Sequence, residues 1–195
     1  MSTSAAVVED FAAAWATSAR DLPFGRNDLA KFLGATGFIK GAEVGVERGI
    51  FSEVLCKAGV SRLMCVDAWM AYAGYREHVT QSNLDRFYDE TKARLSPYGA
   101  AVVRALSVEA ANGVKAGLLD FVYIDGNHVF EHVVADLAAW APKVRSGGIV
   151  AGHDYGRSSV GHVKEAVDAW VAAYKIPGLR ILTGDRSPSW LWVQP

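Results

Sequence analysis

Two short runs in the second half of the chain bring carboxylates and imidazoles together. The run YIDGNH contains Asp125 and, three residues later, His128, and the run AGHDY contains the neighbours His153 and Asp154. Carboxylates grouped in this way suit a hard divalent cation such as Mg²⁺ that keeps part of its water shell. An imidazole beside them suits a general base. Each pair alone is also compatible with a structural hydrogen bond or an ordinary turn, so the hypothesis depends on the two runs lying together.

A second constellation lies earlier in the chain, in the run EVGVERG. Gly45 allows a tight turn, and Gly49 allows close backbone approach and helix packing. Asp67 follows Gly45 by about 20 residues, the spacing at which an acidic side chain accepts hydrogen bonds from ribose hydroxyls. Together these residues predict an adenosine-containing cofactor; the alternative is a tight turn followed by a helix-capping Asp67.

Two acidic residues help to choose between cofactors. The anionic pyrophosphate of NAD binds best at a glycine-rich turn and a bare helix N-terminus. Here Glu43 and Glu47 stand in or beside the turn, and Glu47 occupies the place where the dinucleotide fingerprint has glycine. The methionine part of S-adenosylmethionine carries an ammonium and a sulfonium, which tolerate nearby carboxylates. The sequence therefore favours S-adenosylmethionine over NAD.

The elements that must position these residues follow a regular pattern. Apolar runs that predict strands alternate with amphipathic stretches that predict helices, which favours a doubly wound α/β fold with a mostly parallel sheet and helices on both faces. Ligands of such sheets bind beyond the carboxyl ends of the strands, so Asp125, His128, His153 and Asp154 are expected to converge. The predicted strands are 41–46, 62–69, 100–106, 118–125 and 147–154, with 179–184 and 189–193 as a closing hairpin. The predicted helices are 5–19, 27–33 (capped by Asn27), 50–59, 75–95, 107–113, 129–140 and 160–174.

Length and composition set the outer limits. The chain has 195 residues and a formal net charge of −1, which fits a single domain and gives no support for a nucleic-acid or membrane partner. We divide it into an N-terminal helical extension (1–37) and a catalytic body, with 69–97 as either a lid insertion or a packed helix. The first helix is expected to pack on a partner subunit, as in a homodimer, or on its own sheet. Cys56 and Cys65 are expected to be buried free thiols, which with the absence of a targeting segment favours a cytoplasmic protein.

From about residue 38 to 193 the chain resembles the class I S-adenosylmethionine-dependent methyltransferases. Within them it resembles the small bacterial branch related to macrocin-type sugar O-methyltransferases and the cephamycin-cluster methyltransferase. The segment DFVYIDGNHVFEHVVADLAAWAPKVRSGGIVAGHDY (120–155) carries most of the resemblance, and the AVDAW and SWLW runs near the C-terminus fit the same group.

The resemblance implies a seven-stranded Rossmann-like sheet with a reversed last strand. It also implies a set of cofactor-binding residues: Glu43, Gly45 and Gly49 around the methionine part, Asp67 on the ribose, Ser107 near the adenine, and Asp125 beside the cofactor. In the metal-dependent sugar members, an Asp after the fourth strand and an acidic pair after the fifth hold Mg²⁺. Here Asp125, His153 and Asp154 take these positions, and His153 departs from the pattern because it replaces an acidic residue. His128 takes the position of the general base.

The resulting hypothesis is methyl transfer from S-adenosylmethionine to a hydroxyl of a sugar, glycoside or oligosaccharide, with Mg²⁺ assistance and His128 as the base. A catechol-like small phenol is the alternative acceptor. The alternative enzyme class is an NAD-dependent oxidoreductase, and a non-catalytic sensor of an adenosine ligand is a third possibility.

Overall fold

The computed structural model describes residues 4–71, 79–156 and 161–195. Its helices are α1 (Ser4–Trp15), α2 (Arg26–Ala35), α3 (Ile50–Lys57), α4 (Gln81–Leu95), α5 (Ser107–Asn112), α6 (Phe130–Trp140) and α7 (Val163–Tyr174), with short 3₁₀ turns at Ser96–Tyr98 and Ala141–Lys143. Its strands are β1 (Asp21–Leu22), β2 (Lys40–Val44), β3 (Arg62–Asp67), β4 (Ala101–Arg104), β5 (Leu119–Ile124), β6 (Val144–Gly152), β7 (Arg180–Leu182) and β8 (Ser189–Val193).

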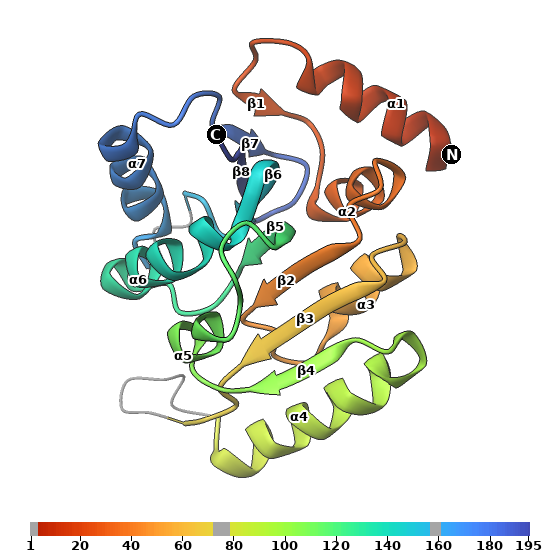
Figure 1. Cartoon of the computed structure of the whole chain (residues 1–195), viewed down its shortest axis with the longest axis vertical. Helices are drawn as coiled ribbons and strands as arrows, with labels where there is room; N and C mark the ends of the chain where they lie inside the picture. The colour runs from red at the N-terminus through yellow and green to blue at the C-terminus, as the bar shows by residue number, and fades with distance from the viewer. Residues whose placement is uncertain (1–3, 72–78, 157–160) are drawn as a thin grey trace.

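The strands form one sheet in the order β1-β7-β8-β6-β5-β2-β3-β4 (Figure 1). β8 runs antiparallel to its neighbours β6 and β7, and the other strand pairs are parallel. The predicted α/β class, parallel sheet and reversed last strand are therefore confirmed. The sheet has eight strands rather than seven, because β1 adds two residues at the edge beside β7. The chain leaves β2 towards β3 and β4 and returns to β5 on the other side, so the topological switch point lies between β2 and β5.

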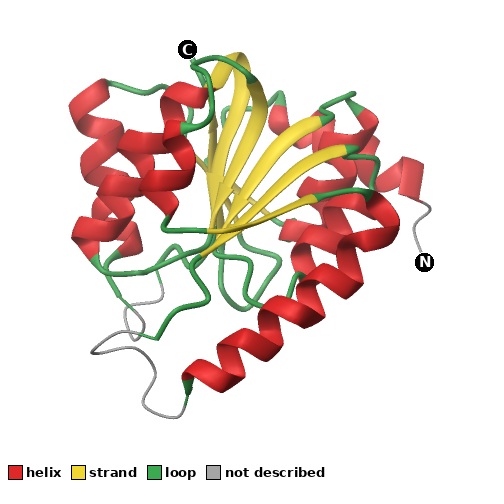
Figure 2. Cartoon of the chain, turned by 60° about the horizontal axis from the view of Figure 1, so that its bottom comes forward, coloured by secondary structure: helices red, strands yellow, loops and turns green. Residues whose placement is uncertain are grey.

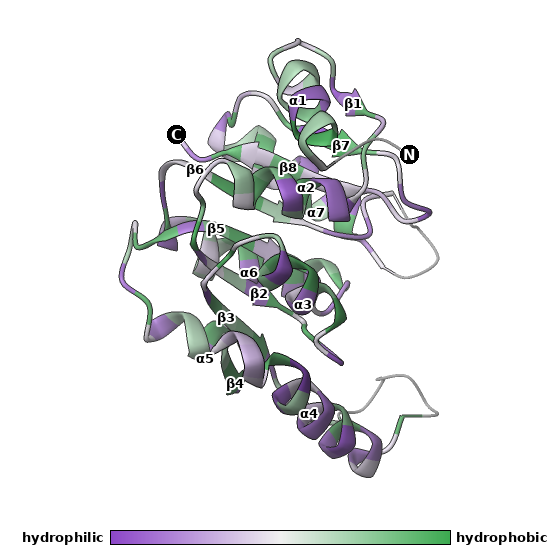
Figure 3. Ribbon diagram, turned by 90° about the vertical axis from the view of Figure 1, so that its right-hand side faces the viewer, coloured by the Kyte–Doolittle hydropathy of each residue, from purple (hydrophilic) through white to green (hydrophobic). Residues whose placement is uncertain are grey.

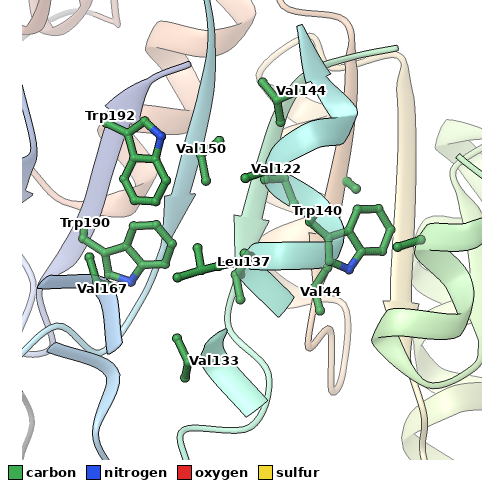
Figure 4. Packing of buried hydrophobic residues seen from close by; sticks show 14 of the residues in the cluster. Val44, Val122, Val133, Leu137, Trp140, Val144, Val150, Val167, Trp190 and Trp192 are labelled. Carbon is green, nitrogen blue, oxygen red and sulfur yellow. The ribbon is translucent and has the colours of Figure 1, made fainter. Parts of the chain in front are cut away.

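Helices cover both faces of the twisted sheet (Figure 2). Residues of α5, α6 and α7 pack with one set of strand side chains, and residues of α1, α2, α3 and α4 pack with the other. Figure 4 shows the first of these cores, where Leu137 and Trp140 of α6 lie against Val44 and Val122 of the central strands. Because both faces are covered, every residue of β5 except Asp120 is buried, which explains why this strand reads as a continuous apolar run.

The N-terminal segment packs on its own chain. Phe11 of α1 is fully buried and its ring lies 4.9 Å from that of Phe24 and 4.8 Å from that of Phe32. The N-cap of helix α2 lies two residues earlier than expected: it is Gly25, not Asn27, and Asp28 accepts a hydrogen bond from the Gly25 backbone N–H. The first helix therefore packs within the chain, against Phe24 and against Phe32 of α2, and a further contact with a partner subunit stays a prediction.

The region considered as a lid is described only in part, because residues 72–78 lie outside the described ranges. Helix α4 carries hydrophilic residues over much of its surface (Figure 3), and Thr80 caps its start. Leu84 and Leu95 of this helix are buried in the same core as residues of α1, α2 and α3, so α4 itself is packed, and a lid in the rest of the region stays a prediction.

Two further observations concern the expected environment of the chain. Cys65 is fully buried as expected, but Cys56 on α3 is only partly buried, at the margin of the core that contains Leu55. None of the helices in the described ranges combines the length and the apolar character that a membrane span requires.

Candidate functional site

The first turn, residues 45–49 between β2 and α3, is shaped by backbone conformation. Gly45 has a φ of 88° and Gly49, the N-cap of α3, a φ of 70°. A Cβ at Gly45 would lie 2.1 Å from the carbonyl oxygen of Asp125, so this position needs glycine for its conformation and for its space. Glu47 has a φ of 51°, a conformation that glycine adopts more easily. The prediction of a tight turn at this position is confirmed.

Asp67 ties the first turn to the end of β3. Its Oδ2 accepts a hydrogen bond of 2.8 Å from the backbone N–H of Glu47, and its Oδ1 accepts one of 2.8 Å from the backbone N–H of Trp69. Burial raises the pKa of Asp67, and these backbone bonds oppose that rise. A carboxylate has about four lone-pair positions, so Asp67 can also accept hydrogen bonds from a ribose. That role stays a prediction.

Glu43 was expected to be a carboxylate beside the first turn, but in the structure it is buried and hydrogen-bonded. It is 2% exposed, and the Ser52 hydroxyl donates a hydrogen bond to it. Burial raises the pKa of Glu43 to about 8 against the opposing hydrogen bond from Ser52. Near neutral pH most Glu43 side chains are therefore protonated, and the exposed acidic residue of the first turn is Glu47.

Ser107 lies at the start of α5, at the carboxyl end of β4. Its hydroxyl oxygen accepts a hydrogen bond of 2.8 Å from the indole N–H of Trp140. It also bonds to Asp136, whose pKa burial raises to about 6. This side chain is therefore engaged with α6, and a contact between Ser107 and adenine stays a prediction.

The carboxylate–imidazole cluster consists of Asp125, His128, His153 and Asp154, and the structure brings all four together. Parallel pairing of β5 and β6 places Asp125 beside His153, and the backbone N–H of His153 donates to the carbonyl of Ile124. His128 Nε2 lies 3.6 Å from Asp125 Oδ1 and 3.3 Å from Asp154 Oδ2. His153 Nδ1 lies 3.6 Å from Asp125 Oδ2 and 3.5 Å from Asp154 Oδ2. The predicted convergence of the two runs is thus observed.

Opposite charges dominate the cluster. The pKa of Asp125 lies below its usual value. Burial alone would raise this pKa, but the nearby imidazoles of His128 and His153 lower it by more. Burial likewise opposes ionisation of Asp154, yet His153 holds the pKa of Asp154 well below its usual range. Burial lowers the pKa of His153, and the two carboxylates overcome this and raise it to about 9. Near neutral pH His153 is a cation between two anions.

Three members of the cluster are arranged as cation ligands would be. One ligand atom from each of Asp125, His128 and Asp154 lies within 4.8 Å of the other two. His128 Nε2 is buried and makes no hydrogen bond to any described residue, so a lone pair or a proton on this nitrogen is available for chemistry. Two carboxylates and an imidazole fit a divalent cation. His153 was expected in this shell, but it would have to lose its proton before Nδ1 offered a lone pair.

The backbone around the cluster is held by neighbouring loops. The carbonyl of His128 accepts a hydrogen bond from the backbone N–H of His162, and Gly161 has no room for a Cβ against His128. Asp154 has a φ of 56°, and Ser187 from the β7–β8 hairpin bonds to its carboxylate. The carbonyl of His153 accepts a hydrogen bond of 3.2 Å from the indole of Trp190.

One residue of the site was missed in the sequence. Arg26, at the start of α2, lies with its guanidinium 3.5 Å from Asp125 Oδ2. It belongs to the N-terminal extension, about 100 residues away from Asp125 in the chain, and no motif surrounds it. The only sequence signal is a basic residue at a helix start, where the helix dipole disfavours a positive charge.

Comparisons with known proteins agree with the fold. A sequence model of a family described as a methyltransferase domain matches residues 42–155. The O-methyltransferase NovP is 19% identical and aligns with a TM-score of 0.63 over 87% of this chain and 79% of its own. An O-methyltransferase from Bacillus cereus, solved in complex with SAH, is 14% identical with a TM-score of 0.61 over 96% of this chain and 90% of its own.

An enzyme with a different acceptor atom is also similar. The N-methyltransferase NodS from Bradyrhizobium japonicum WM9 is 14% identical with a TM-score of 0.59 over 87% of this chain and 94% of its own. No curated protein matches the sequence. At these identities the structural similarity shows the fold alone, and the atom that receives the methyl group must be argued from the site.

Proposed function

The chain belongs to the methyltransferase-domain family, and from that premise we propose that it transfers the methyl group of S-adenosylmethionine to a hydroxyl oxygen of a sugar, glycoside or oligosaccharide. The observation that carries the proposal is the carboxylate–imidazole cluster. It lies at the carboxyl ends of β5 and β6, next to the first turn on β2. This is the edge at which open α/β sheets bind their ligands.

The cofactor is proposed to bind along the switch point between β2 and β5. Gly45 and Gly49 let its methionine part approach the backbone, Asp67 accepts hydrogen bonds from the ribose hydroxyls, and the segment at Ser107 borders the adenine. Asp125 and Glu43 flank the methionine part. Support comes from the positive φ values of both glycines and from the closeness of Gly45 to Asp125.

His128 is proposed to remove the proton from the acceptor. An alcohol is a weak nucleophile, and proton removal by a positioned base accelerates such steps by about 10²–10⁴-fold. The proton moves from the acceptor oxygen to His128 Nε2, and the resulting imidazolium lies beside Asp125 and Asp154. The acceptor oxygen forms a bond to the methyl carbon, the carbon–sulfur bond breaks, and its electron pair stays on the sulfur of S-adenosylhomocysteine. Alignment of the two reactants supplies a large share of the acceleration.

The carboxylates of Asp125 and Asp154 are proposed to hold Mg²⁺. When bound there, the cation would stabilise negative charge on the acceptor oxygen. The fit rests on the carboxylate oxygens of Asp125 and Asp154, which are grouped within ligand distance of one another, and His128 Nε2 is assigned to the proton and not to the cation. His153 supports the site from the other side, since it offsets part of the charge of both carboxylates at 3.5 and 3.6 Å.

The acceptor class rests on the sugar O-methyltransferase resemblance of residues 120–155, and a catechol-like phenol is the second acceptor to test. A small-molecule acceptor fits a single short chain of this fold, and a homodimer stays a prediction. An oxidoreductase that uses NAD is disfavoured, because the methyltransferase-domain match spans the whole predicted cofactor region.

Calorimetric titration of the full chain tests the proposal. S-adenosylhomocysteine should bind with a Kd at or below the micromolar range, and NAD should not bind. Binding of NAD without S-adenosylhomocysteine would refute the proposal. Turnover is then measured with a panel of sugar hydroxyls and phenols, with Mg²⁺ and with an excess of chelator. Full activity in chelator would exclude the metal role, and activity on phenols alone would replace the sugar by the second acceptor class.

A further inference from the structure

The proposed cofactor poses a charge problem that the first turn and the carboxylate–imidazole cluster do not solve. Its amino-acid end carries an ammonium and also a carboxylate. Of the acidic residues assigned to this end, Asp125 is the ionised one that can meet the ammonium, because burial raises the pKa of Glu43. A carboxylate that leaves water needs a cationic or hydrogen-bonding partner. The same edge of the sheet should therefore contain a cation.

Arg26 is positioned to be that cation. Its guanidinium lies 3.5 Å from Asp125 Oδ2. It also lies 5.1 Å from the centre of the ring of Phe51, which is the second residue of α3. It is close enough to Glu43 to lower the pKa of that residue. Its side chain is 32% exposed, so an incoming ligand can reach it. At 3.5 Å the contact with Asp125 is longer than a normal N–H···O bond, and an arginine has five N–H donors in a planar fork that matches a carboxylate.

The fold holds this arginine through tight backbone packing. The backbone N–H of Arg26 donates a hydrogen bond of 2.7 Å to Asp185, in the β7–β8 hairpin. A Cβ on Gly25 would lie 2.6 Å from Asp185, and a Cβ on Gly184 would lie 2.6 Å from Phe24. The N-terminal extension and the C-terminal hairpin therefore fix the start of α2 beside the cluster. The Arg26 guanidinium packs over the face of the Phe51 ring.

Other cations near this edge are engaged elsewhere. His153 lies between Asp125 and Asp154. The guanidinium of Arg48, in the first turn, forms an ion pair with Glu90 at 2.7 Å. That of Arg104, at the end of β4, contacts Asp85 at 2.6 Å. Within the described part of the chain, Arg26 is the arginine that faces both Glu43 and Asp125.

We propose that Arg26 binds the carboxylate of the cofactor's methionine moiety, so that the N-terminal extension, which lies outside the residues matched by the family, completes the cofactor site. The ion pair with Asp125 then has a second role. It keeps the guanidinium beside Asp125. The ammonium of the methionine moiety is then bound by Asp125, and its carboxylate is bound by the adjacent, oppositely charged Arg26. This inference rests on the proposed use of S-adenosylmethionine.

The test compares two ligands that differ only in the carboxylate. These are S-adenosylhomocysteine and its decarboxylated form, S-adenosyl-3-thiopropylamine, each titrated calorimetrically into the full chain. The wild type should bind S-adenosylhomocysteine more tightly. In Arg26→Ala the affinity for S-adenosylhomocysteine should fall about 10- to 100-fold, the range for a charge-assisted contact, while the affinity for the decarboxylated ligand changes less than about twofold. Arg26→Lys should restore part of the loss.

The matched control is Lys31→Ala, which removes a cation from the same helix, where it pairs with Asp28; both affinities should stay at the wild-type values. Equal loss of both ligands in Arg26→Ala would mean that Arg26 merely supports the fold, and the inference would be wrong. Unchanged affinity for S-adenosylhomocysteine would also overturn it, and would leave the proposed function standing. If the wild type bound neither ligand, the proposed function itself would fail, and the inference with it.

Discussion

The first turn and the carboxylate–imidazole cluster lie side by side at one edge of the sheet, but they are built in different ways. The first turn depends on backbone: two glycines with positive φ, and backbone N–H groups that donate to Asp67. All of its parts come from about 25 consecutive residues. The cluster depends on side-chain charge, and its parts come from two separate segments, at Asp125 and Asp154, with Arg26 of a third segment beside Asp125.

The difference predicts different responses to substitution. A change in the first turn should damage conformation and stability, because no other residue type fits the backbone. A change in the cluster should leave the fold in place and damage the reaction, because its charges act on a ligand. Substitutions that separate stability, cofactor affinity and turnover can test whether this division holds.

The largest effect is expected from His128→Ala. Removal of the base should lower kcat by about 10²- to 10⁴-fold, while the affinity for S-adenosylhomocysteine and the midpoint of thermal unfolding stay near the wild-type values. Steady-state kinetics, calorimetry and thermal unfolding measure the three quantities on the same preparation.

His132→Ala is the matched control, since His132 lies four residues later, at the start of α6, and is exposed. It should leave kcat unchanged. Turnover that survived in His128→Ala would assign proton removal to another group, and loss of cofactor affinity in that variant would place His128 in the cofactor site instead.

The next effect is on stability, from Gly45→Ala. The new Cβ would meet the carbonyl oxygen of Asp125 at 2.1 Å and would force an alanine to a φ of 88°. Overpacking and the unfavourable φ each cost about 1–3 kcal/mol, so the free energy of unfolding should fall by about 4 kcal/mol in a urea titration.

Gly37→Ala separates the two causes. Gly37 has a φ of 79°, but a Cβ there would have no neighbour within 4 Å. This control should cost only about 1 kcal/mol. Equal losses in the two variants would show that the approach of Gly45 to Asp125 does not matter, and that the first turn and the cluster are mechanically independent.

The fold and most of the site could be predicted because their signals are local. Alternating apolar strands and amphipathic helices set the parallel sheet, and this sheet brings Asp125 to His153 through neighbouring strand ends. Strand β1 could not be predicted, because its two residues, Asp21 and Leu22, are too few to show a period. The start of α2 was misplaced because its cap comes from Gly25 and Asp185, which are distant in the chain.

The charge state of the site could not be predicted from residue types. Glu43 was expected to be an anion beside the first turn, but its ionisation depends on burial and on the Ser52 hydroxyl. His153 was expected to be a metal ligand, which stays a prediction, and coordinates were needed to see that two carboxylates near its Nδ1 favour the imidazolium. Both outcomes follow from desolvation and distance, which require coordinates.

The third substitution, Glu43→Gln, is expected to have a smaller effect than His128→Ala and Gly45→Ala. It tests whether the first turn is free of buried negative charge, in contrast to the carboxylate–imidazole cluster. Burial raises the pKa of Glu43 from 4.5 to about 8, with Asp125 adding to the rise and Ser52 and Arg26 opposing it. A carboxyl whose pKa is raised on folding stabilises the protein fully below its unfolded pKa and loses that contribution as the pH rises to the folded value. The wild type should therefore lose stability relative to Glu43→Gln between about pH 4.5 and pH 8.

The difference in unfolding free energy between Glu43→Gln and the wild type should grow by roughly 1.4 kcal/mol per pH unit in the middle of this window and by about 3.5 kcal/mol between pH 5 and pH 8. Urea titrations at pH 5, 6, 7 and 8 measure it, and the subtraction removes groups common to both proteins, including His153. Glu131→Gln, an exposed position on α6, should give a flat difference. A flat difference for Glu43→Gln as well would mean that Glu43 is ionised in the folded protein. The first turn would then carry a buried negative charge of its own, and its contrast with the carboxylate–imidazole cluster would no longer hold.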